Sequence, residues 1–122
     1  MREILFRGKG INDKEWRYGF YTEQQGYPYI TPDGVAMYEI DANTAGQYTG
    51  FVDKNGKKIF EGDIVCMDDW IPPCMQIAYA QGVFYLAEID KPVKDYGAIY
   101  YLNNGGKPCA KVIGNIYDDL SY

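Results

Sequence analysis

Two pairs of carboxylates are the residues best suited to carry chemistry. Glu61 and Asp63 flank a glycine, and Asp68 and Asp69 follow side by side. Paired carboxylates can hold a divalent metal ion or divide the acid and base roles of a hydrolysis. An aspartate in a glycine turn also accepts hydrogen bonds from nearby backbone amides. We favour this structural role for the Glu61–Asp63 pair, and we interpret Asp68 and Asp69 as solvated loop charges.

The chain contains no histidine, so catalytic schemes and zinc sites that depend on imidazole are excluded. Its cysteines therefore lack the base that commonly activates a thiol nucleophile. No glycine-rich phosphate loop precedes a helix. The sequence accordingly predicts a protein that is not an enzyme, with no catalytic residue, no metal site and no cofactor.

The cysteines and the start of the chain bear on the cellular compartment. Cys66, Cys74 and Cys109 are odd in number and include no Cys-x-x-Cys pair. An oxidising compartment would leave one unpaired, so we expect three buried structural thiols in a reducing cytoplasm. The first residues have no apolar stretch of signal-peptide length, and the longest apolar runs are too short to span a membrane.

The charge balance limits the choice of partners. The 122 residues carry 12 Lys and Arg against 17 Asp and Glu, a net charge of −5. This argues against a protein that mainly grips phosphate backbones. A local basic patch can still bind nucleic acid, so the cluster of Lys54, Lys57 and Lys58 keeps a nucleic-acid-binding module as the alternative function. An acidic mimic of DNA is disfavoured because the charges of both signs are interleaved.

Strand signals dominate the rest of the chain. In the segment 16–21, Trp16, Tyr18 and Phe20 alternate onto one face. Asn55-Gly56 predicts a hairpin with a type I′ turn, and Pro28 places the strand 27–31 at a sheet edge. Asp41 is expected to cap one short helical turn. Residues 99–102 fit either a strand or a short helix. Further strands are expected at residues 4–6, 35–40, 64–67, 75–79, 83–87 and 111–117.

Aromatic residues suggest contact surfaces. The chain has 13 tyrosines, which either form cross-strand pairs or provide an exposed platform for bases or a protein partner. The Trp70–Pro73 loop is either tucked into the end of the fold or exposed as a contact. Our hypothesis is that Tyr27, Tyr29, Trp70 and Ile71 lie in a homo-oligomer contact.

Three motifs together resemble the YopX-like family of phage and prophage proteins. They are Phe6-Arg7-Gly8-Lys9 with Trp16-x-Tyr18-Gly19, the central segment from Gln47 to Val65, and Val112-Ile113-Gly114-Asn115-Ile116-Tyr117-Asp118. The resemblance implies a β-rich N-terminal part with short helical turns plus a C-terminal SH3-like barrel. It also implies self-association in at least some members, and it supplies no activity, cofactor or ligand.

These observations predict a mainly β protein formed by a single YopX-like domain over residues 1–122. Its lobes are expected at about 1–50 and 51–122. The predicted function is that of a non-catalytic phage or prophage accessory protein that acts as a small β binding or self-assembly module. Its expected partners are copies of itself or a host or phage protein, in the cytoplasm of the host cell and without a membrane role.

Overall fold

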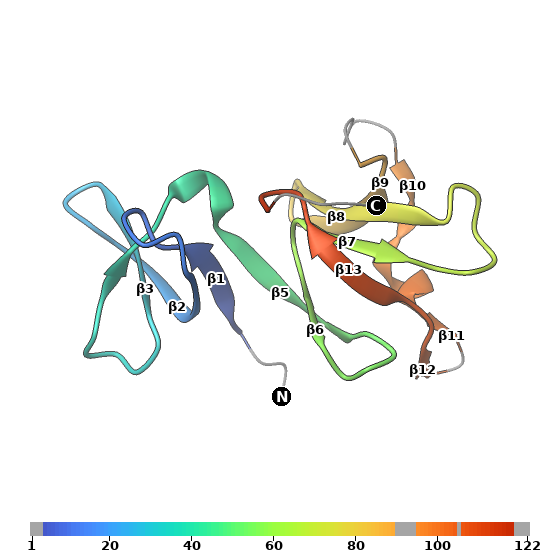
Figure 1. The fold of residues 1–122 in the computed structure, drawn as a ribbon, viewed down its shortest axis with the longest axis horizontal. Helices are drawn as coiled ribbons and strands as arrows, with labels where there is room; N and C mark the ends of the chain where they lie inside the picture. The colour runs from blue at the N-terminus through green and yellow to red at the C-terminus, as the bar shows by residue number, and fades with distance from the viewer. Residues whose placement is uncertain (1–3, 90–94, 105, 119–122) are drawn as a thin grey trace. The chain divides into compact units, whose positions relative to one another are not determined.

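The computed structural model consists almost entirely of antiparallel β structure (Figure 1). It describes residues 4–89, 95–104 and 106–118. Two compact units divide the chain, Met1–Tyr48 and Thr49–Tyr122. The described residues form no α-helix and two 3-10 turns, η1 (Ala42–Thr44) and η2 (Ile99–Leu102). The prediction of a mainly β fold is therefore confirmed.

The N-terminal unit is built on a meander of four strands. Its strands pair in the order β4-β3-β2-β1, and β5 (Gly46–Val52) adds to β1 through Gly46 and Gln47 before it continues into the second unit beside β6 (Lys58–Phe60). Ile30 and Ile40 are fully buried in the N-terminal unit. The four strands of the meander are β1 (Phe6–Lys9), β2 (Trp16–Gln24), β3 (Tyr27–Thr31) and β4 (Tyr38–Glu39).

Three predictions for this unit are wrong in detail. The strand expected at residues 4–6 is β1, which begins at Phe6 and runs on to Lys9 because it pairs there with β2. Strand β3 has the predicted bounds but lies between β2 and β4, not at an edge. Pro28 is tolerated because β4 pairs only with Tyr29 and Ile30, and Pro28 itself contributes its carbonyl to the Ile40 amide, 3.1 Å away. The strand expected at 35–40 shrinks to Tyr38–Glu39, and Val35 stays 85% exposed. Asp41 caps η1 as predicted, accepting from the Asn43 amide.

The hairpin that joins β5 to β6 is present, but its turn is not type I′. A type I′ turn needs positive φ at both central residues, and only Gly56 (φ +80°) meets this condition. The Gly56 amide instead donates to the Asp53 carbonyl at 3.0 Å, and the Asp53 amide donates to the Lys57 carbonyl at 2.8 Å. This is a type I turn closed by a left-handed glycine. The Asp53 side chain selects it by accepting from the Asn55 amide.

The C-terminal unit contains a five-stranded antiparallel sheet in the order β10-β9-β8-β7-β13 (Figure 1). Strands β8 and β9 pair as predicted through Gln81-Gly82, both with positive φ. Within the described residues this sheet does not close into a barrel. Its strands are β7 (Asp63–Cys66), β8 (Cys74–Ala80), β9 (Val83–Ala87), β10 (Asp95–Ala98) and β13 (Lys111–Asn115), and a separate two-stranded ribbon contains β11 (Asn103–Asn104) and β12 (Lys107–Pro108).

A hydrophobic core holds this unit together. The ambiguous segment 99–102 is the 3-10 turn η2, which buries Leu102 completely. Burial of one such side chain contributes about 1.5–3 kcal/mol. The buried core residues are Ile59, Val65, Met67, Met75, Ile77, Phe84, Leu86, Leu102, Ala110 and Val112.

We expect Gly62→Ala to destabilise the protein more than Gly82→Ala does, by about 1–2 kcal/mol. Both glycines have positive φ, +90° and +81°, so both variants carry the backbone cost of an alanine there. A Cβ at Gly62 would also lie 2.7 Å from Cε2 of Tyr117, whereas a Cβ at Gly82 meets nothing within 4 Å. Urea denaturation of both variants measures the difference. Equal losses would contradict the packing role of Gly62.

Candidate functional site

A hollow of about 450 Å³ opens on the C-terminal unit beside the 67–73 loop, which joins β7 to β8. We call it the Trp70 hollow. Its lining combines apolar residues with a larger number of polar and charged ones. The apolar members are Met67, Trp70, Pro108 and Cys109, and the others are Lys54, Asp68, Asp69, Tyr101, Asn103 and Lys107. Met67 is 2% exposed, so this lining continues into the hydrophobic core. An apolar lining joined to polar residues is typical of a binding site.

Trp70 and Ile71 have opposite environments although they are adjacent in the loop. The Trp70 ring packs against the core and contacts the Tyr101 ring edge-on, with 5.5 Å between the ring centroids. Ile71 is 97% exposed. Of the two interpretations of this loop, the tucked one holds for Trp70 and the exposed one for Ile71. The Trp70 packing therefore anchors one point of the loop, next to the exposed Ile71.

The charges around the hollow separate by sign. Asp68 and Asp69 lie in the loop, whereas Lys54 comes from the β5–β6 hairpin and Lys107 from β12. One pair closes within the chain, with 3.5 Å between Lys54 Nζ and Asp68 Oδ2. The Asp68 side chain is nevertheless 90% exposed, so this ion pair adds little stability. The loop thus contributes the negative charges of the lining, and Lys54 and Lys107 contribute the positive ones.

The tyrosines beyond the hollow also interact. Tyr101 lines the hollow. The Tyr100 ring lies against the Tyr101 ring, with 4.4 Å between the two ring centroids. A side-chain hydrogen bond and an electrostatic interaction with Tyr101 raise the pKa of Tyr100 above its ordinary value. Tyr100 is 60% exposed. Neither tyrosine was identified from the sequence, because residues 99–102 had no clear periodicity.

The other predicted residues are not gathered at the hollow. Lys57 and Lys58 are exposed on the β5–β6 hairpin, so only Lys54 of the basic cluster lines the hollow. Tyr27 and Tyr29 belong to the N-terminal unit, where alternation along β3 puts them on one face of the sheet.

That face of the N-terminal unit also carries Tyr18 and Phe20. Their strand β2 pairs with β3, and the registers Thr22↔Tyr29 and Gln24↔Tyr27 put the even-numbered residues of β2 on the tyrosine face. Tyr18, Phe20 and Tyr27 are 46%, 59% and 56% exposed. The sequence signal for this surface was the alternation of Trp16, Tyr18 and Phe20. It is a second aromatic surface, in a different unit from the hollow.

The two predicted carboxylate pairs lie in different environments. Asp63 is 1% exposed, and its carboxylate accepts from the Phe60 amide at 2.8 Å, which confirms its structural role in the turn. Asp68 and Asp69 are exposed, as expected. Among the described residues no three His, Cys, Asp or Glu side chains group as metal ligands would. No helix in the described part of the chain is long and apolar enough to cross a membrane.

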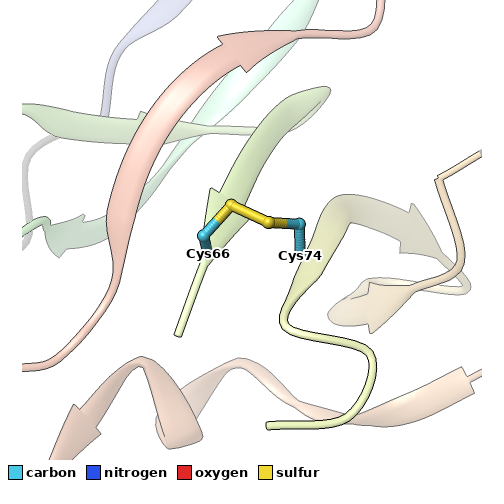
Figure 2. Close-up of a disulfide and its surroundings, with 2 residues drawn as sticks. All are labelled: Cys66 and Cys74. Atoms are coloured by element: carbon cyan, nitrogen blue, oxygen red, sulfur yellow. A yellow bond between two sulfur atoms is a disulfide. The ribbon is translucent and has the colours of Figure 1, made fainter. Parts of the chain in front are cut away.

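The cysteine prediction is wrong, because Cys66 and Cys74 form a disulfide (Figure 2). They lie directly opposite each other at the end of the β7–β8 pairing, with 4.1 Å between their Cα atoms. Counting cysteines could not reveal this register, although the two residues end the strands that flank one loop. Cys109 keeps its thiol, which donates to the Tyr101 and Leu102 carbonyls at 3.2 and 3.1 Å.

The fold and the hollow define a small antiparallel β protein with a candidate binding site. The family model described as YopX protein matches residues 5–120. The chain therefore belongs to the YopX protein family, as the three motifs suggested. No curated protein matches the sequence.

Proposed function

We propose that this protein is a non-catalytic binding module that self-associates through the 67–73 loop and the Trp70 hollow. The observation that carries the proposal is Ile71, 97% exposed in a loop that borders a hollow lined by both apolar and charged residues. An apolar side chain placed this way gains free energy when a pocket of matching chemistry covers it. The occupant we propose is the Ile71 side chain of a second copy.

Charge complementarity supports a second copy as the partner. The loop that carries Ile71 also carries Asp68 and Asp69, and Lys54 and Lys107 complete the charged part of the lining. Lys54 already pairs with Asp68 of its own chain, with 3.5 Å between Nζ and Oδ2. In a two-fold pair, each loop faces the hollow of the other copy, so every contact forms twice. Asp69 of one copy then approaches Lys107 of the other. A surface that contains both an exposed apolar residue and its receptor is self-complementary.

The biological setting is part of the same proposal. Membership of the YopX family supports a phage or prophage accessory role in the host cytoplasm. We also propose that residues 51–122 form the SH3-like barrel that the family resemblance implies. The short antiparallel strands and the Gly62-Asp63 turn into β7 support it.

Sedimentation equilibrium between about 1 and 200 µM tests the proposed function. We expect the average mass to rise with concentration from the monomer value of 13.9 kDa towards twice that value. A mass that stays at 13.9 kDa over the whole range would contradict self-association.

The nucleic-acid alternative is tested on the same protein preparation. A titration with labelled single-stranded and duplex DNA at physiological salt is expected to show no complex tighter than about 10⁻⁶ M. The net charge of −5 and the Lys54–Asp68 ion pair support this expectation. A tighter, salt-sensitive complex that weakens when Lys57 and Lys58 are replaced would favour the alternative.

A further inference from the structure

We propose that the Cys66–Cys74 disulfide is a reversible redox switch that controls self-association through the 67–73 loop. The inference rests on the function proposed above. The disulfide joins the last residue of β7 to the first residue of β8 (Figure 2). Every residue of the loop lies between the two sulfur atoms, including Ile71 and the loop residues that line the Trp70 hollow.

Besides the disulfide, the loop is held by the packing of Met67 and Trp70 on the core, by the Lys54–Asp68 ion pair and by two backbone hydrogen bonds. Among the described residues, the backbone hydrogen bonds that tie it are Met67 N to the Pro73 carbonyl, 2.8 Å, and Trp70 N to the Met67 carbonyl, 3.3 Å. Beyond Trp70, whose ring packs on Tyr101, Ile71 is 97% exposed and has little packing of its own. The covalent link therefore restrains the part of the loop that presents Ile71.

Opening the disulfide weakens association because ordering the loop then becomes part of the binding step. A loop closed by a covalent link has fewer conformations in the free chain, and a preorganised surface loses less entropy when it binds. With two thiols in place of the link, more of the free copies present Ile71 in other orientations. We expect association to become about tenfold weaker on reduction.

The redox step needs only a dithiol as the reductant and a small-molecule disulfide as the oxidant. A dithiol reductant supplies two electrons, the Sγ–Sγ bond breaks, each sulfur receives one proton, and the reductant becomes a disulfide. Oxidation by a small-molecule disulfide reverses the step and releases its two thiols. Cys66 and Cys74 are half-buried, not enclosed in the core, so a small reagent can approach them. In a reducing cytoplasm the open form would predominate, and oxidants would favour assembly.

The test measures the dissociation constant of self-association in oxidised glutathione and in dithiothreitol. The number of alkylated cysteines reports the disulfide state: one (Cys109) when it is closed and three when it is open. The double variant Cys66→Ser, Cys74→Ser is the open-state control. We expect the reduced protein and this variant to associate equally, each about tenfold more weakly than the oxidised protein, with no redox response left in the variant.

Three results would overturn the switch. Equal association of oxidised and reduced wild-type protein would do so while leaving the proposed function intact. A variant that still responds to dithiothreitol would show that another thiol is responsible. No association in either state would remove both the proposed function and the switch. If the double variant does not fold, the wild-type comparison with its alkylation count still decides the question.

Discussion

Replacing Asp53 with alanine is expected to lower the free energy of unfolding by about 3–5 kcal/mol. Asp53 is 2% exposed, and its carboxylate accepts from three backbone amides, those of Asn55, Lys57 and Val112, at 2.8, 2.9 and 3.0 Å. Two of these bonds form the β5–β6 turn, and the third ties that turn to β13. Removing the carboxylate leaves three backbone amides without their acceptor, and that of Val112 is buried. A buried donor left unpaired is the costly way to lose a hydrogen bond.

The matched control for this prediction is Asp68→Ala. Asp68 is also an aspartate of the C-terminal unit, but its side chain is 90% exposed and meets only Lys54. We expect its replacement to change stability by no more than about 0.5 kcal/mol. Urea denaturation at pH 7 measures both variants, with unchanged m-values as the sign of two comparable transitions. A loss below about 1 kcal/mol for Asp53→Ala would contradict the account.

The Asp53 carboxylate also predicts how stability changes in acid. Burial acts to raise its pKa, but the hydrogen bonds from the Val112, Lys57 and Asn55 amides outweigh burial and hold the pKa of Asp53 below its ordinary value. The unfolded chain therefore binds this proton more readily than the folded one. The stabilisation is complete above the unfolded pKa of about 3.9 and is lost as the pH falls through the lower folded value.

Denaturation curves of the wild type and Asp53→Asn between pH 7 and pH 2 test this linkage. The asparagine has no charge to lose, so we expect a shallower loss of stability in acid for the variant than for the wild type. Parallel curves would show that Asp53 does not contribute to the acid transition.

Ile71→Ser is expected to weaken self-association about a thousandfold. Burial of an isoleucine side chain contributes about 2 kcal/mol, and a two-fold pair buries two of them, so the variant loses about 4 kcal/mol. Because Ile71 is 97% exposed in the single chain, its replacement should leave the fold unchanged. Serine removes the apolar surface without adding a charge beside Asp68 and Asp69.

Val83→Ser is the matched control for the Ile71 variant. Val83 is an apolar residue of the same unit, 60% exposed at the start of β9 and not part of the lining of the hollow. We expect this variant to associate like the wild type in sedimentation equilibrium. If both variants weaken association equally, or if neither does, Ile71 is not the anchor of the contact.

Local sequence signals predicted most strands but not the way they are combined. The Gln81-Gly82 turn and strand β9 follow from side-chain chemistry over a few residues, and the structure has them as predicted. The type of the turn at Asn55-Gly56 does not follow from such local chemistry. The dipeptide allows two turn types, and the hydrogen bond from the Asn55 amide to the Asp53 carboxylate stabilises one of them. Part of that carboxylate's role is the bond to Val112, 59 residues away, and no local pattern contains such a contact.

The candidate site shows the same limit. Trp70 and Ile71 stood out as apolar residues in a polar loop, and the structure explains their different exposure by the packing of Trp70 on Tyr101. Lys107 and Tyr101 reach the hollow from segments more than thirty residues further along the chain. The Cys66–Cys74 link depends on the register of β7 against β8. The exposure of the two loop residues, the lining of the hollow and the disulfide all depend on how the strands and loops pack in the folded protein. Local sequence patterns do not specify that packing.

A mixture of two charge-reversed chains tests self-association through the hollow most directly. In the proposed pair, Asp69→Lys places a positive charge opposite Lys107 of the second copy, and Lys107→Glu places a negative charge opposite its Asp69. Each variant alone therefore places like charges across both contacts of a two-fold pair. In the mixed pair, lysine 69 meets glutamate 107 and the native Asp69 meets the native Lys107. The charges within each chain are the same alone and in the mixture, so any rescue reports contacts between chains.

Sedimentation equilibrium of each variant and of their equimolar mixture gives the decisive comparison. The account predicts that each variant alone stays close to the monomer mass of 13.9 kDa, and that the mixture associates at least tenfold more tightly than either. A mixture that associates no better than its components would contradict the proposal that the 67–73 loop of one copy enters the Trp70 hollow of another.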